Sequence, residues 1–184
     1  MEESITKDDI TALEELISLF ENWNNKYNSV AKKFKMGNKI AGFLGEAIAF
    51  REISHLGIDS AWVGGTHKGY DIKLNGKEIM INVKTANNAL RYKGRGADKK
   101  PDHYEWSVGW SSAEEAKTYG NKLVFIFVDL KNFESKPDFY IVPSVVIEKY
   151  FLPNGIRDST WPWARWHPEL SEIQPYKGAW TNLD

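Results

Sequence analysis

The chain has 184 residues, of which 42% are hydrophobic and 27% are charged, and its net charge at pH 7 is −1. This length supports one domain with a sizeable hydrophobic core, and the small net charge excludes a global basic field that would attract a polyanion. The absence of cysteine excludes disulfides and thiolate metal sites. The acidic N-terminus lacks the apolar core of a signal peptide, and no apolar run is long enough for a membrane span. We therefore expect a cytoplasmic protein that does not enter a membrane.

The charge is distributed unevenly along the chain. Residues 1–20 contain six acidic residues and one lysine, whereas residues 85–104 contain five basic residues and two aspartates. A surface that binds nucleic acid is therefore expected to be local, near the second of these segments.

Two helices are predicted at the start of the chain. Residues 8–34 and residues 39–56 both carry apolar residues at helical spacing. Within the second helix, Gly42 and Gly45 indicate close packing against a sheet.

Strands are predicted next, in residues 60–63, 70–74 and 78–84, where apolar and β-branched residues are frequent. The pair Asn75-Gly76 predicts a two-residue hairpin turn between the last two strands.

The segment that follows is polar. Residues 86–103 are basic and contain glycine, and they predict a long loop. A helix is then expected to begin after Ser111 or Ser112, because a serine followed by glutamates is typical of a capped N-terminus.

The last predicted elements are a buried strand in residues 122–130, its partner strand in 138–143 and a short helix over 144–152. The remaining residues are rich in Pro and Trp and show no clear period. This order predicts one α/β domain, residues 1–184, with a mixed central β-sheet flanked by helices. Within it we distinguish an N-terminal helical extension (1–36), a core (37–150) and a Trp/Pro-rich C-terminal tail (151–184).

Polar residues stand where the predicted hairpin strands meet one end of the sheet. Asp71 begins one strand and Lys84 ends the other, so in an antiparallel pair they lie at the same end. Asn82 and Lys84, two residues apart, point to one face. Magnesium prefers hard oxygen ligands and retains several waters, so one or two carboxylates suffice to hold it. Lys84 would then stabilise an attacking hydroxide or the charged phosphate.

Glu46 is a third candidate, because it lies in a helix among apolar neighbours, where a carboxylate needs a partner such as a metal-bound water. The alternative is that these charges are solvated or form surface ion pairs of little consequence.

Three short motifs in this order resemble one nuclease family. The segment G-x-x-G-E-x-x-A ends at Ala49, G-Y-D-I contains Asp71, and I-N-V-K-T contains Lys84. The series resembles the PD-(D/E)XK superfamily of restriction-endonuclease-like nucleases. The resemblance implies a restriction-endonuclease-like core and a Mg²⁺-dependent DNA endonuclease, with Mn²⁺ as a substitute for Mg²⁺.

The resemblance also implies roles for individual residues. Asp71 would be the central metal ligand, and Lys84 the catalytic lysine. Val83 would offer its backbone carbonyl to the metal, and Glu46 would be a further metal ligand. Asn82 completes the catalytic set, but it stands where the family has a carboxylate.

The amide at position 82 changes the expected charge of the site. Its oxygen can coordinate a cation but contributes no charge, so the set sums to −1 and metal affinity should fall by about one to three decades. Three interpretations remain open: a native variant site, a degenerate domain that binds DNA without cutting it, or an Asp→Asn substitution that inactivates a nuclease. The alternative function is thus a catalytically silent DNA-binding or assembly subunit. A third is a structural domain whose hairpin charges are incidental.

Basic residues near this site predict contacts with double-stranded DNA, because lysine and arginine neutralise backbone phosphates. They are Arg91, Lys93, Arg95, Lys99 and Lys100 in the predicted loop, and His67 and Lys68 before Asp71. Cutting both strands of a duplex requires two active sites, so we expect a homodimer or a partner subunit.

Overall fold

The computed structural model describes residues 6–33, 37–64, 69–109, 115, 117–131, 136–151 and 165–184. Its α-helices are α1 (Lys7–Lys33), α2 (Gly37–His55), α4 (Ser144–Phe151) and α5 (Leu170–Ile173). Its strands are β1 (Ser60–Trp62), β2 (Ile72–Leu74), β3 (Met80–Ala86), β4 (Leu90–Lys93), β5 (Lys100–Tyr104), β6 (Trp106–Ser107), β7 (Leu123–Asp129), β8 (Asp138–Pro143) and β9 (Arg165–Trp166). Short 3-10 turns are η2 (Gly96–Asp98), η3 (Gly120–Lys122), η5 (Gln174–Tyr176) and η6 (Trp180–Leu183).

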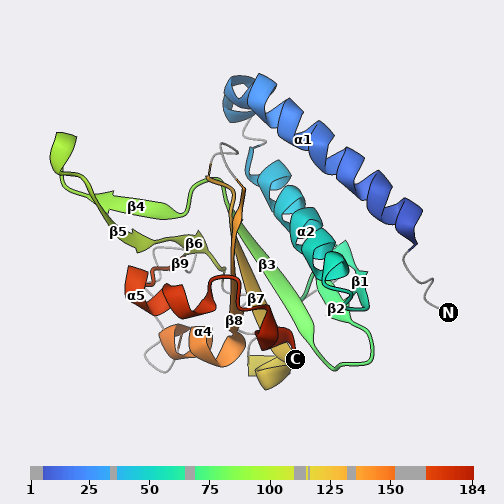
Figure 1. The fold of residues 1–184 in the computed structure, drawn as a ribbon. Helices are drawn as coiled ribbons and strands as arrows, with labels where there is room; N and C mark the ends of the chain where they lie inside the picture. Colours follow the sequence, from blue (N-terminus) through green and yellow to red (C-terminus); the bar gives the residue numbers. More distant parts are fainter. Residues whose placement is uncertain are drawn as a thin grey trace.

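A mixed five-stranded sheet in the order β1-β2-β3-β7-β8 forms the centre of the molecule (Figure 1). β3 and β7 are parallel, and the other neighbouring strands are antiparallel. Every residue of β7 is buried, which explains its continuous apolar sequence. The predicted mixed sheet with flanking helices is confirmed, and so is the pairing of β7 with β8.

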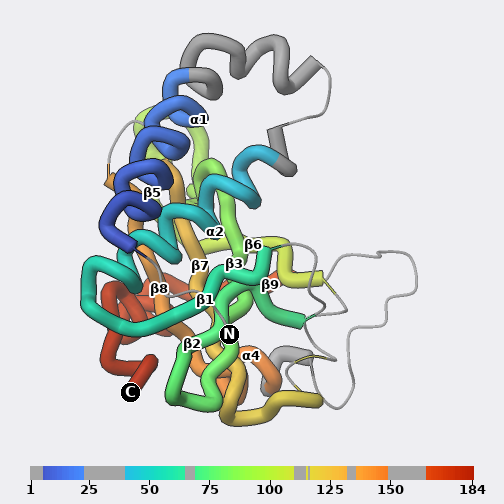
Figure 2. Tube along the Cα trace, turned by 90° about the vertical axis from the view of Figure 1, so that its right-hand side faces the viewer, coloured from blue at the N-terminus to red at the C-terminus, as the bar shows by residue number. Residues whose placement is uncertain are grey.

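One face of the sheet is covered by α2, with α1 lying outside it (Figure 2). Leu13 and Ile17 of α1 are buried in the same core as Ile48 of α2 and Ile81 and Val83 of β3. Since α2 has neighbours on both sides, its apolar residues are not confined to one stripe. None of the helices in the described ranges is long and apolar enough to cross a membrane.

The opposite face packs against an aromatic core. Trp106 of β6 and Trp166 of β9 are buried against Phe127 of β7, and Ile147 of α4 and Ile173 of α5 join the same cluster. Side chains of a strand alternate between faces, so β3 divides its residues between the two cores. Asn82 and Lys84 therefore point to the face opposite α2.

The predicted helices agree with α1, α2 and α4 within two residues at each end. The long loop predicted for residues 86–103 is wrong, because β4 and β5 form an antiparallel two-stranded ribbon there. No residue of either strand is buried, and the apolar–polar alternation of β4 spans only four residues and does not continue into β5, so the sequence offers little of the pattern that reveals a half-buried strand.

The two-residue turn predicted at Asn75-Gly76 is also wrong. Leu74 N–H donates to the carbonyl of Ile79 at 3.0 Å, so residues 75–79 connect the strands. Tertiary hydrogen bonds hold Asn75 in place of the tight turn. Its backbone N–H donates to the Asp59 carbonyl at 2.9 Å, and its side-chain amide donates to the Asp59 carboxylate at 3.0 Å. These bonds tie the start of the turn to the segment before β1.

The C-terminal segment runs beside the outer strand β8. Gly178 N–H donates to the carbonyl of Phe139 at 2.8 Å, and the Asn182 side-chain amide donates to the carbonyl of Ile141 at 2.7 Å. These bonds occupy backbone groups at the outer edge of β8, and Leu183 enters the core beneath α2. Residues 152–164, which include much of the Trp/Pro-rich tail, lie outside the described residues.

The prediction that glycines let α2 pack closely on the sheet is confirmed for Gly45 and wrong for Gly42. A Cβ atom added at Gly45 would lie 1.8 Å from Thr85 Oγ1 of β3, whereas no atom of the described residues outside the backbone of α2 itself lies within 4 Å of one added at Gly42. Glycine at position 45 therefore sets the distance between α2 and β3.

Replacing Gly45 by alanine should lower the free energy of unfolding by about 2 kcal/mol or more, because helix and strand must move apart. Gly42→Ala is the matched control, and it should be neutral or stabilising by up to about 1 kcal/mol through helix propensity. Urea unfolding followed by circular dichroism measures both changes. Equal losses in the two variants would contradict the packing described here.

Candidate functional site

The site begins where β2 separates from β3, at Asp71. Its backbone N–H donates to the Ile81 carbonyl at 2.8 Å, and its carboxylate Oδ2 accepts from Val83 N–H at 2.7 Å. Its carbonyl accepts from the N–H groups of Val63 and Gly64, at 2.9 and 3.2 Å. The Asp71 carboxylate thus occupies the place of a backbone partner of β3, and the Asp71 backbone is bonded to β3 on one side and to residues 63–64 on the other.

Burial raises the pKa of Asp71, while the Val83 N–H and the Lys84 ammonium lower it. The carbonyl of Val83 lies beside this carboxylate, because the N–H and C=O of one strand residue face the same neighbour. A cation held by Asp71 could therefore also be coordinated by the Val83 carbonyl oxygen, as the resemblance to the nuclease superfamily implies.

Lys84 lies in the field of three carboxylates. Burial lowers the pKa of its ammonium, and Asp71, Glu115 and Glu46 act in the opposite direction, Asp71 most strongly. The structure thus brings together Glu46, Asp71 and Lys84, which the sequence analysis singled out on separate elements, and adds a fourth residue.

Glu46 reaches the site from α2. The indole Nε1–H of Trp62 donates to its Oε2 at 3.3 Å. Burial and the neighbouring Asp71 carboxylate raise the pKa of Glu46 to about 7, although the Trp62 bond and Lys84 oppose this. Two desolvated carboxylates beside each other are a costly arrangement that a bound cation relieves.

The raised pKa of Glu46 predicts how stability depends on pH when divalent ions are absent. Below about pH 4.5 the carboxyl group is protonated in both the folded and unfolded states. As the pH rises to about 7, the unfolded state releases its proton first, so the free energy of unfolding should fall by about 1 to 2 kcal/mol once solvent screening of this partly exposed group is counted. Urea unfolding in a chelating buffer from pH 4.5 to 8 measures this decline.

Glu46→Gln should remove most of that decline, and Glu15→Gln, at an exposed position of α1, is the matched control that should keep it. Saturating Mg²⁺ should also reduce the decline in the unaltered protein, because a cation favours the ionised carboxylate. The same pH dependence in the unaltered protein and Glu46→Gln would contradict this account of Glu46.

Asn82 is only 5% exposed, and its amide is oriented by two acceptors. Its Nδ2 donates to the Gly69 carbonyl at 3.2 Å and to Glu115 Oε2 at 3.1 Å. Among the described residues, no hydrogen-bond donor reaches its buried Oδ1. A buried acceptor without a donor is costly, and coordination to a cation would satisfy it.

Glu115 is the site residue that sequence reasoning missed. It belongs to the helical segment before β7, and its carboxylate lies against the amide at position 82. The two glutamates of this segment are typical of the first turn of a helix, so no local signal distinguishes this side chain. With Glu115 the site carries three carboxylates and one lysine, a formal charge of −2 rather than the expected −1.

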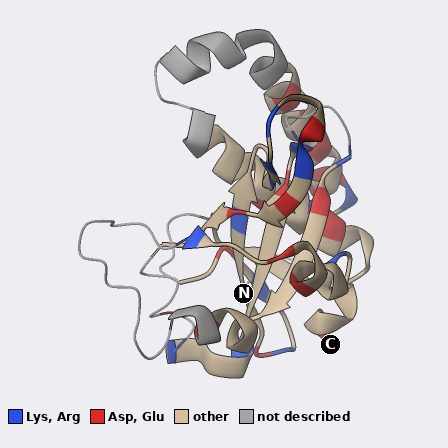
Figure 3. Ribbon diagram, turned by 90° about the vertical axis from the view of Figure 1, so that its left-hand side faces the viewer, with Lys and Arg blue, Asp and Glu red and all other residues tan. Residues whose placement is uncertain are grey.

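The predicted DNA-contacting residues have different surroundings. Lys93, Arg95, Lys99 and Lys100 are exposed at the end of the ribbon, which follows β3 in the chain. Figure 3 shows where Lys and Arg (blue) and Asp and Glu (red) lie on the described residues. Arg91, in contrast, donates to the Asn88 carbonyl at 2.6 Å and to Glu105 Oε1 at 3.2 Å. His67 and Lys68 lie outside the described residues.

The oxygen atoms at this site fit a hard divalent cation, since they belong to carboxylates, to the Asn82 amide, whose oxygen accepts no hydrogen bond from the described part of the chain, and to a backbone carbonyl. Comparison of the chain with protein-family models, with curated proteins and with solved structures finds no match.

Proposed function

We propose that this chain is a Mg²⁺-dependent DNA endonuclease of the restriction-endonuclease-like class, able to use Mn²⁺ in place of Mg²⁺. The observation that carries the proposal is the position of Lys84 among the carboxylates of Asp71, Glu115 and Glu46. Burial raises the pKa values of two of these carboxylates, Glu46 and Asp71, and groups with perturbed pKa values are concentrated at functional sites.

The arrangement of elements supports the same class. A helix carrying Glu46 precedes a run of three antiparallel strands, with Asp71 directly before the second strand and Lys84 in the third, and this third strand is parallel to β7. This is the order that the sequence motifs imply for a restriction-endonuclease-like core.

In the proposed reaction Asp71 would hold the cation, and Glu115 and Glu46 would add negative charge around it. The Asn82 Oδ1 and the Val83 carbonyl offer two further oxygen ligands. The cation would supply charge neutralisation at the scissile phosphate and a water of lowered pKa. The Lys84 ammonium stabilises the charge that develops on the phosphate oxygens during hydrolysis.

The proposed substrate is double-stranded DNA, held by the exposed basic residues of the ribbon, Lys93, Arg95, Lys99 and Lys100. Each phosphate contact makes the affinity depend on salt. A homodimer or a partner subunit would supply the second active site that cutting both strands requires.

The second candidate is a catalytically silent DNA-binding or assembly subunit. It is favoured by the neutral amide of Asn82, whose Nδ2 already uses Glu115 as an acceptor. In this alternative Glu115 serves only to satisfy the amide, and the cluster binds no catalytic ion.

The test is cleavage of supercoiled plasmid by the unaltered chain in Mg²⁺, with EDTA and the variant Asp71→Asn as controls. Nicked or linear product that needs both Mg²⁺ and Asp71 is the expected result. DNA binding that weakens steeply with salt, without any cleavage, would favour the silent subunit. Failure both to bind and to cut DNA would contradict both candidates.

A further inference from the structure

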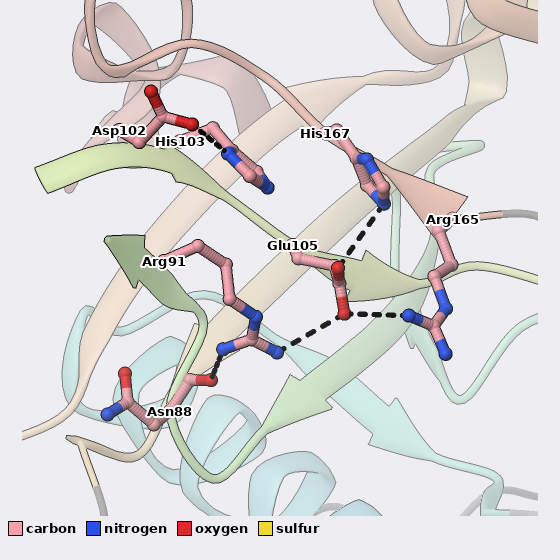
Figure 4. Close-up of polar contacts among 7 residues, drawn as sticks. All are labelled: Asn88, Arg91, Asp102, His103, Glu105, Arg165 and His167. Carbon is pink, nitrogen blue, oxygen red and sulfur yellow. Dashed lines mark hydrogen bonds and ion pairs between the residues drawn. The ribbon is translucent and has the colours of Figure 1, made fainter. Parts of the chain in front are cut away.

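A second group of side chains, outside the carboxylate site, has metal-ligand character (Figure 4). His103 of β5, Glu105 between β5 and β6, and His167 after β9 each offer a ligand atom, and these atoms all lie within 4.8 Å of one another. The Nε2 of His167 is 3.5 Å from Glu105 Oε2, and the two imidazole rings are stacked with centroids 5.3 Å apart.

The neighbours of this cluster orient its donor atoms. The Nδ1 of His103 pairs with Asp102 Oδ2 at 2.8 Å, which leaves Nε2 as the atom open to a ligand. A carboxylate on the outer ring nitrogen is a common support for a metal-binding histidine. In Glu105, Oε1 accepts from Arg91 at 3.2 Å and from Arg165 at 3.1 Å, while Oε2 faces His167.

We propose that His103, Glu105 and His167 bind a divalent ion of the zinc class. Two imidazoles and one carboxylate suit zinc and its neighbours in the transition series, whereas Mg²⁺ prefers oxygen ligands alone. Three protein ligands leave a fourth position for water. A cavity of about 450 Å³ lined by Asp102, His103, His167 and Glu169 gives an ion access from solvent.

The charges around the cluster are compatible with a cation. Arg91 and Arg165 are positive, and Glu105, Asp102 and Glu169 are negative, so the formal charge before any ion binds is −1. Both arginines are engaged with the one oxygen of Glu105 that does not face the histidine. They hold the carboxylate in place and leave its other oxygen for the metal.

The proposed ion would join parts of the chain that are far apart in sequence. Tyr104 N–H donates to the Pro168 carbonyl at 3.1 Å, and His103 forms an isolated bridge with Glu169. Backbone contacts thus already hold the C-terminal segment beside β5 at this position. Bound metal would fasten that segment to the base of the ribbon and stabilise the folded state.

The experiment is titration of the EDTA-treated, dialysed protein with Zn²⁺ in an isothermal calorimeter. We expect one equivalent to bind with a dissociation constant on the order of micromolar. His103→Ala and His167→Gln should each weaken binding on the order of 100-fold, whereas His55→Ala, at an exposed histidine of α2, should not. The melting temperature should rise with Zn²⁺ in the unaltered protein and in His55→Ala only.

Two further variants separate this site from the nuclease proposal. Asp71→Asn should retain the high-affinity Zn²⁺ equivalent whether or not the chain cleaves DNA. Asp102→Asn should weaken Zn²⁺ binding about 10-fold or more without replacing a ligand. Absence of binding below about 100 μM in the unaltered protein would overturn the proposal, as would binding that survives both histidine substitutions.

Discussion

Replacing Lys84 by alanine is expected to reduce Mg²⁺-dependent DNA cleavage about 100- to 1,000-fold while changing DNA affinity little. The proposal gives the Lys84 ammonium one function in the reaction, to stabilise charge that develops at the phosphate, and the loss of such a group costs this much in other hydrolases. DNA affinity should persist because the exposed basic residues that we assign to DNA binding are on the ribbon, at the end of β4 and beyond.

The matched control for this variant is Lys73→Ala, which removes an exposed lysine from the neighbouring strand β2. Single-turnover cleavage of a labelled duplex gives the rate, and fluorescence anisotropy in Ca²⁺ gives the affinity. Equal rates for Lys84→Ala and the unaltered chain would remove Lys84 from the mechanism. Parallel losses of binding and cleavage would assign it to DNA binding instead.

Glu115→Gln is expected to lower both Mg²⁺ affinity and cleavage, by about 10- to 100-fold each. The glutamine oxygen can still accept from Asn82 Nδ2, so the substitution removes charge while keeping the hydrogen bond. One unit charge at a few ångströms is worth a few kcal/mol before desolvation is subtracted, which gives this range.

The double variant Asn82→Asp/Glu115→Gln should recover much of the loss, because it restores three carboxylates around Lys84. The single variant Asn82→Asp places a fourth carboxylate against Glu115, so its effect should not add to that of Glu115→Gln. Calorimetric Mg²⁺ titration and cleavage rates complete the double-mutant cycle, with Glu15→Gln on α1 as the control. Additive effects would show that positions 82 and 115 do not share one function.

Local patterns in the sequence predict a large part of the fold. Helical periodicity locates α1, α2 and α4, and the continuous apolar run predicts β7, because these elements bury wide apolar surfaces. The β4–β5 ribbon buries little apolar surface, so its sequence contains neither helical periodicity nor a continuous apolar run. The conformation of the turn after β2 depends on the hydrogen bonds between Asn75 and Asp59, and residues so far apart in the chain are not considered by rules based on local sequence.

In the candidate site, too, some residues could be predicted from the sequence and others could not. The hairpin geometry of β2 and β3 brings Asp71 and Lys84 to one end of the sheet, so their spacing in the sequence is informative. Glu115 reaches Asn82 only through packing of the segment before β7, and His167 reaches Glu105 only through the return of the C-terminal segment. Contacts of this kind arise from the tertiary fold, and a single sequence does not reveal them.

The central claim is that the carboxylates around Lys84 form a divalent metal site, and the most direct measurement is the position of Mn²⁺ in soaked crystals by anomalous diffraction. The account predicts an ion bound to the Asp71 carboxylate, with an oxygen of Glu115, Glu46, Asn82 or Val83 as a further ligand, and its absence in Asp71→Asn crystals. Crystals soaked at millimolar Mn²⁺ that show no ion at Asp71 would contradict it.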